Sequence, residues 1–122
     1  MITYNGKVFR SVSNSETGEV DAETRFHYHQ DGEIVWATYA GGKVRFGTLI
    51  ARLQAGDVLD MRYQHVNAHG QFMAGECRSV PSVLPDGRLR LDETWRWTTG
   101  DRSSGRSVVE EVERVLADEL AD

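Results

Sequence analysis

The sequence predicts an all-β fold, an antiparallel up-and-down meander of about eight strands that closes into a small barrel. Three observations support this prediction. Short segments alternate between apolar and polar residues. Glycine-containing turns separate these segments at regular intervals. The connections leave no room for a crossover helix, so neighbouring strands must be antiparallel, and closure removes the two exposed edges that an open sheet would keep.

The segments follow one another in a simple order. Alternation predicts strands at residues 7–13, 21–30, 33–40, 43–53, 57–67, 71–80 and 88–98. Asp31-Gly32 and Gly41-Gly42 are expected to form two-residue hairpin turns, because these residues tolerate the positive φ that such turns need. Residues 81–87 are expected to form a loop.

The last segment has two interpretations. Its apolar residues have helical spacing, which alone predicts an amphipathic helix; they are Val108, Val112, Val115, Leu116 and Leu120. A closed meander, however, needs a strand that returns to the first one, and residues 106–112 are the only segment left. We therefore expect residues 106–112 to pair with residues 7–13, followed by a short helical or frayed tail.

Composition narrows the class of protein. With 39% hydrophobic and 27% charged residues, the chain has the composition of a single globular domain, which we expect to span residues 1–122. No apolar run or leader-like start predicts membrane insertion or secretion. The single cysteine, Cys77, excludes an internal disulfide and suits a cytoplasmic location. The net charge of −5 disfavours nucleic-acid binding.

The seventh strand places a carboxylate on an apolar face. The residues that share this face by alternation are Leu89, Leu91, Glu93, Trp95 and Trp97. Burying an unpaired carboxylate is costly, so we expect Glu93 to bond a Tyr, Trp, His or Arg of an adjacent strand. Glu93 is then either a structural anchor of the barrel or a ligand-facing or acid/base group.

Two further strands complete the expected cavity wall. Alternation groups Leu59, Met61, Tyr63 and His65 in the fifth strand, and Met73, Gly75, Cys77 and Ser79 in the sixth. If both sets point inward, His65 lies near Glu93, an arrangement that general acid/base chemistry needs. The alternative is a core histidine satisfied by ordinary hydrogen bonds.

Metal and cofactor chemistry are not expected. His27 and His29 lie two residues apart on one strand face, which is compatible with a divalent metal, but their polar neighbours indicate a solvent-exposed outer face. Cys77 has no partner motif and is interpreted as a small buried hydrophobe rather than a nucleophile. No strand-turn-helix unit that could cradle a pyrophosphate is present, so no cofactor is expected.

Several sequence phrases resemble a family of short bacterial proteins that commonly carries the label N-acetylglutamate synthase. The phrases are residues 39–42, 60–67, 93–98 and 100–107, together with Glu110 and Glu111. The resemblance extends over nearly the whole chain. It implies acetyl transfer from acetyl-CoA to glutamate, and it brings no catalytic residues with it.

The leading functional hypothesis is a barrel that binds a small molecule, with a lipocalin-like architecture and an aromatic surface from Trp36, Trp95 and Trp97. The ligand-binding candidates are Glu93, His65, Tyr63, Trp95, Trp97, Tyr39 and Cys77. The first alternative is a small enzyme of the isomerase, dehydratase or decarboxylase type that uses Glu93 with His65 or Tyr63. An acetyltransferase, as the resemblance implies, and a barrel filled by its own side chains are the others. The ligand and the oligomeric state stay open.

Overall fold

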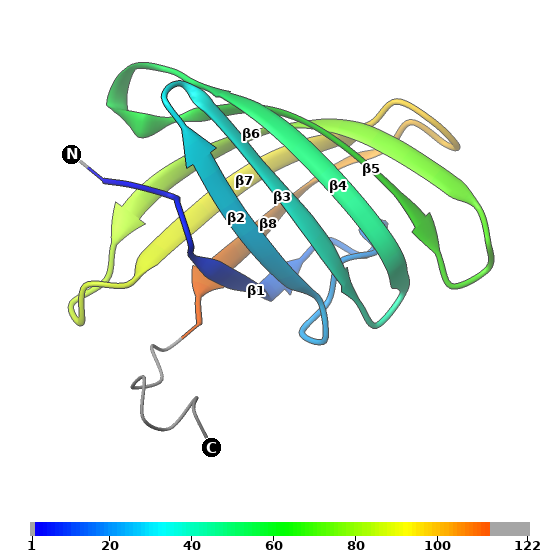
Figure 1. Ribbon diagram of the computed structural model, residues 1–122. Coiled ribbons are helices and arrows are strands. Elements are labelled where there is room, and N and C mark those ends of the chain that lie inside the picture. Colours follow the sequence, from blue (N-terminus) through cyan, green and yellow to red (C-terminus); the bar gives the residue numbers. More distant parts are fainter. Residues whose placement is uncertain (1, 113–122) are drawn as a thin grey trace.

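The computed structural model describes residues 2–112, which form a closed antiparallel barrel of eight strands (Figure 1). The strands are β1 (Val8–Asn14), β2 (Arg25–Asp31), β3 (Ile34–Gly41), β4 (Val44–Leu53), β5 (Leu59–Asn67), β6 (Phe72–Val83), β7 (Leu89–Trp97) and β8 (Ser104–Glu111). One turn of 3-10 helix, η1 (Ala55–Asp57), lies between β4 and β5. The predicted all-β meander is confirmed.

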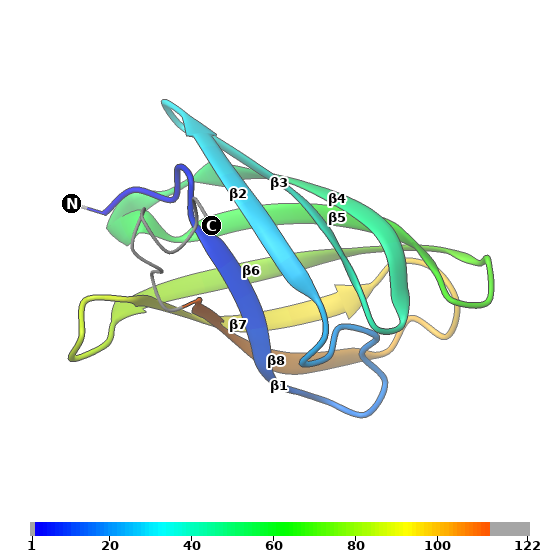
Figure 2. The same cartoon turned by 60° about the horizontal axis from the view of Figure 1, so that its bottom comes forward.

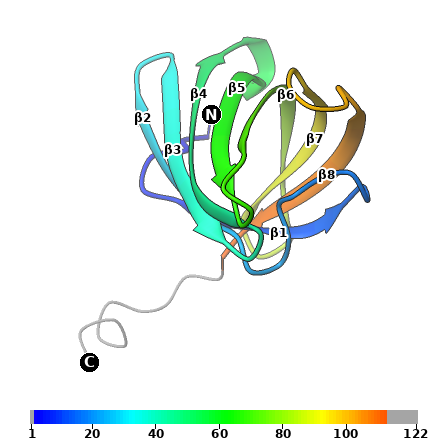
Figure 3. The same cartoon turned by 90° about the vertical axis from the view of Figure 1, so that its right-hand side faces the viewer.

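The barrel closes where the last strand meets the first. Each strand pairs with the next along the chain, and β8 pairs with β1 from Phe9↔Glu111 to Asn14↔Ser107. This confirms the expected closing strand. β1 pairs with β2 over three residue pairs only, from Val8 to Arg10. Figure 3, turned to look towards one end, shows the strands arranged around an interior.

The strand boundaries differ from the predicted ones in two places. β2 begins at Arg25 rather than at Asp21, because residues 15–24 form a long loop. β6 continues to Val83 through Pro81, where a loop was expected. Proline is tolerated there because β5 pairs with β6 only as far as Ser79, so Pro81 has β7 as its single partner strand.

Two hairpin turns lie one residue later than predicted. Asp31 pairs with Ile34, and Gly41 pairs with Val44, so the central turn residues are Gly32-Glu33 and Gly42-Lys43. Gly32 and Gly42 have φ of 60° and 62°. A glycine with positive φ at the first central position is typical of a type II′ turn, which matches the twist of the paired strands.

The expected tail lies outside the described residues from residue 113 onward, and with it most of the segment with helical spacing. The part that the structure describes, up to Glu111, is strand β8. Within residues 2–112, no helix is long and apolar enough to cross a membrane.

Strand alternation sorts the side chains as expected, with one error. The inward-facing residues of β5, β6 and β7 include the buried Leu59, His65, Cys77 and Trp97. His27 and His29 lie on the exposed outer face. Trp36, however, was expected to contribute to the interior, and it lies on the outer face, 40% exposed. The alternation of β3 buries its neighbours Val35 and Ala37 instead.

The two ends of the barrel are closed differently. At one end the N-terminal segment packs inward, because Tyr4 is fully buried and its hydroxyl donates to the Asp57 carbonyl at 2.6 Å. The opposite end carries the β1–β2, β3–β4, β5–β6 and β7–β8 connections, as an up-and-down order requires. We call the β1–β2 connection, residues 15–24, the β1–β2 loop; Figure 2 shows it beside the β3–β4 turn.

Candidate functional site

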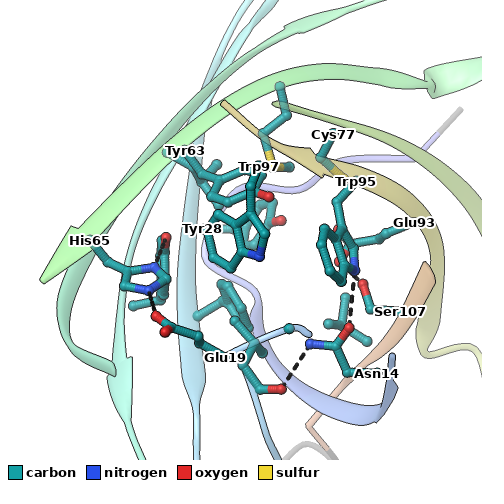
Figure 4. Close-up of a pocket in the computed structure, with 17 residues that line it drawn as sticks. Asn14, Glu19, Tyr28, Tyr63, His65, Cys77, Glu93, Trp95, Trp97 and Ser107 are labelled. Carbon is teal, nitrogen blue, oxygen red and sulfur yellow. Dashed lines mark hydrogen bonds and ion pairs between the residues drawn. The ribbon is translucent and has the colours of Figure 1, made fainter. Parts of the chain in front are cut away.

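A cavity lies inside the barrel beneath the β1–β2 loop. Its free volume is about 50 Å³, room for roughly three to five water molecules. Figure 4 shows the side chains that line it. They are Asn14, Glu19, Val20, Phe26, Tyr28, Tyr39, Leu49, Met61, Tyr63, His65, Cys77, Glu93, Trp95, Trp97, Ser107 and Val109, together with Gly18.

Glu93 provides a carboxylate to this otherwise largely apolar cavity. Ser79 of β6 donates a hydrogen bond to Oε2 at 2.5 Å, and Ser107 of β8 donates to Oε1 at 3.1 Å. Both serines lie directly opposite Glu93 in the strand register. Burial raises the pKa of Glu93, and the two serine hydrogen bonds oppose that rise. The inward position was predicted, but the expected Tyr, Trp, His or Arg partner was wrong.

Aromatic rings form the walls of the cavity. The Trp95 and Trp97 rings lie 5.6 Å apart, and Trp97 makes edge contacts with the rings of Tyr63 and His65, each at 5.7 Å. Tyr39 stacks on Phe26 at 4.8 Å. Such rings offer flat apolar contact area together with polar N–H or O–H groups.

Inward-facing glycines make room for three of these rings. A Cβ at Gly47 would lie 2.4 Å from the Tyr39 ring, and one at Gly105 would lie 2.4 Å from the Trp95 ring. At Gly75 a Cβ would lie 2.3 Å from the Tyr63 hydroxyl. Each glycine is the cross-strand partner of the ring that it accommodates. The strand register thereby fixes where the aromatic walls lie.

His65 links the cavity wall to the β1–β2 loop. Its Nδ1 lies 2.9 Å from the Tyr39 hydroxyl, and its Nε2 lies 2.8 Å from Glu19 Oε1. Burial raises the pKa of Tyr39, which keeps its hydroxyl protonated. The Tyr39 O–H can therefore donate to Nδ1, while the Nε2 hydrogen is donated to Glu19. The histidine side chain is fully buried.

Further hydrogen bonds tie the loop to the interior. Trp97 Nε1 donates to the Thr17 carbonyl, and Trp95 Nε1 donates to Asn14 Oδ1, both at 3.0 Å. Asn14 Nδ2 in turn donates to the Val20 carbonyl at 3.0 Å. Gly18 packs against Asn14 so closely that a Cβ would lie 2.2 Å from Asn14 Nδ2. The loop is thus a close-fitting cover of the cavity.

The structure brings all seven predicted candidates to this cavity, but it does not join them as predicted. Glu93 and His65 line the same cavity with different hydrogen-bond partners, so the described contacts contain no direct Glu93–His65 pair. Cys77 is buried, and burial raises the pKa of its thiol, which fits its interpretation as a small hydrophobe.

Sequence reasoning missed two of the residues that complete the site. Glu19 and Asn14 belong to a polar turn-like stretch that has no strand periodicity, so alternation assigned them no face. The one available signal is that this connection is longer than the other turns of the meander. A long loop in a compact barrel is often functional.

A closed up-and-down barrel of eight strands with an aromatic-lined interior belongs to the class of β-barrels that can hold one small ligand. A family model described as avidin-like protein matches residues 2–112, so the chain belongs to the avidin-like family. Searches of curated proteins and of solved structures found no match. The resemblance to proteins labelled N-acetylglutamate synthase has no support from these comparisons.

Proposed function

We propose that the protein binds a small organic molecule inside the barrel, with its N–H groups directed at Glu93. The main support is the Glu93 carboxylate itself, which lies in an aromatic cavity and accepts one serine hydrogen bond on each oxygen. An ionised carboxylate offers about four acceptor positions. The positions beyond the two serine bonds are suited to a flat N–H donor such as a cyclic urea or an amidine.

The rest of the cavity fits the same class of ligand. Trp95, Trp97 and Tyr63 supply flat faces on which a planar group can stack. Family membership points in the same direction, because avidin-like barrels bind small ligands such as biotin, which contains a cyclic urea. The free volume of about 50 Å³ suits a fragment of a few atoms, so a larger ligand needs the β1–β2 loop to move.

Calorimetric titration with biotin and with its cyclic urea fragment, 2-imidazolidinone, tests the proposal. We expect wild-type protein to bind at least the fragment. Glu93→Gln should weaken binding by about tenfold to a hundredfold, the cost of one charge-assisted hydrogen bond. Asp92→Asn, which removes a neighbouring carboxylate on the exposed outer face of β7, is the matched control and should bind like wild type. Absence of binding, or equal binding by Glu93→Gln, would refute the proposed ligand class.

A further inference from the structure

A second group of N–H donors lies at the mouth of the cavity, on the opposite side from Glu93 (Figure 4). His65 Nε2 lies 2.8 Å from Glu19 Oε1, and Asn67 Nδ2 donates to Glu19 Oε2 at 3.0 Å. Trp97 Nε1 donates to the Thr17 carbonyl close by in sequence. All three donors belong to the barrel wall, and all three acceptor groups belong to the β1–β2 loop. The carboxylate of Glu19 is therefore held by two donors of β5.

These donors are oriented without help from the loop. Asn67 Oδ1 accepts the backbone N–H groups of His69 and Gln71, each at 3.0 Å, which turns its Nδ2 towards Glu19. The Tyr39 hydroxyl bonds His65 Nδ1, which leaves Nε2 for Glu19. If the loop moved away, both donors would still point into the mouth. Asn67 is 2% exposed, so such donors would need a new acceptor.

The chemistry of the mouth favours an anionic group. Two N–H donors that converge on the two oxygens of one carboxylate form a carboxylate-binding geometry. Lys43 of the β3–β4 turn and His69 of the β5–β6 turn line an adjacent hollow together with Glu19. A cation beside the mouth adds to the attraction for an anion. Glu93, at the other side of the cavity, favours donors instead.

From this arrangement we infer that the mouth is a binding subsite for the carboxylate group of a ligand, and that Glu19 of the β1–β2 loop occupies it in the ligand-free protein. The inference rests on the proposed function, since Glu19 and His65 line the same cavity as Glu93. A ligand with a carboxylate at one end would replace Glu19 at His65 and Asn67. The released loop would then provide the space that the closed cavity lacks.

Chemical complementation of a Glu19→Ala variant tests the subsite. The probe is acetate, with acetamide as the uncharged isostere and chloride at matched ionic strength. The readouts are the NMR signals of the Trp97 indole N–H and the His65 side chain. We expect acetate to shift these signals saturably in Glu19→Ala, about tenfold more tightly than acetamide does. Glu16→Ala removes an exposed glutamate of the same loop and, like wild type, should not respond at these concentrations.

A second variant keeps the test decisive if Glu19→Ala does not fold. Glu19→Gln retains the size of the side chain but directs an amide N–H towards one of the two donors, so acetate should displace it where wild type is unaffected. Equal responses to acetate and acetamide, or equal responses of the Glu19 and Glu16 variants, would overturn the subsite. Because acetate is tested alone, its binding without any binding of biotin or 2-imidazolidinone would refute only the proposed ligand class. The reverse result would refute only the subsite.

Discussion

Glu93 shows what single-residue reasoning can and cannot predict. Its inward position follows from the alternation of β7, because Leu91 and Trp95 on either side fix the face. Its partners depend on the register of β7 with β6 and β8, which alternation does not provide. In the observed register, Ser79 and Ser107 lie directly opposite the carboxylate, so two short hydroxyls reach it where a longer partner was expected.

Replacing this carboxylate should make stability less dependent on pH. Burial raises the pKa of Glu93 in the folded protein, whereas an unfolded Glu has a pKa of about 4.3. Protonated Glu93 is therefore favoured by folding, and this stabilisation is complete below the unfolded pKa and lost as pH rises through the folded pKa. Glu93→Gln, which mimics the protonated form, should gain stability relative to wild type as pH rises, by about 1.4 kcal/mol for each unit of pKa elevation.

Urea unfolding of wild type and Glu93→Gln between about pH 4 and pH 8 measures this difference. Asp92→Asn is the control, because Asp92 is exposed and pairs with Arg90 on the outer face. A stability difference between Glu93→Gln and wild type that does not change with pH would contradict the account. A large loss of stability at all pH values would instead identify Glu93 as a purely structural acceptor.

At the scale of elements, regular strands were predictable and the irregular loop was not. Alternation located every strand, and the turns were misplaced by one residue because glycine pairs allow more than one turn position. The β1–β2 loop has neither a strand nor a helix period. Its conformation depends on tertiary contacts with Trp95, Trp97 and His65, and no local pattern encodes such contacts.

The closing strand is fastened by a buried carboxylate. Glu111 Oε1 accepts the Leu89 backbone N–H at 3.0 Å, and Oε2 lies 3.4 Å from Lys7 Nζ, with the side chains 5% and 12% exposed. Glu111 thus links β8 to β7 and to the residue that precedes β1. Removing one partner of a buried ion pair leaves the other uncompensated, so Glu111→Ala should destabilise the fold by about 3–5 kcal/mol.

Chemical denaturation measures this loss, and the neighbouring Glu110→Ala is the matched control. Glu110 alternates to the other face of β8 and is partly exposed, so its replacement should change stability by about 0.5 kcal/mol or less. Similar effects of the two variants would show that Glu111 does not fasten the closure.

For the molecule as a whole, closure was predictable from topology, whereas the content of the interior was not. An eight-stranded meander with short turns has two free edges, and pairing β8 with β1 removes them. How much space remains inside depends on rotamers and on glycine positions. Gly47, Gly75 and Gly105 let rings lie against the wall, while the β1–β2 loop and Tyr4 close the ends. The account therefore describes a small closed cavity with an acceptor at one side and donors at its mouth.

The most direct test is a crystal structure of the protein grown with 2-imidazolidinone. The account predicts one ligand molecule inside the barrel, with an N–H nitrogen within hydrogen-bond distance of a Glu93 oxygen and its plane against Trp95 or Trp97. A ligand found only on the outer face, or a cavity that stays without ligand at a saturating concentration, would contradict it.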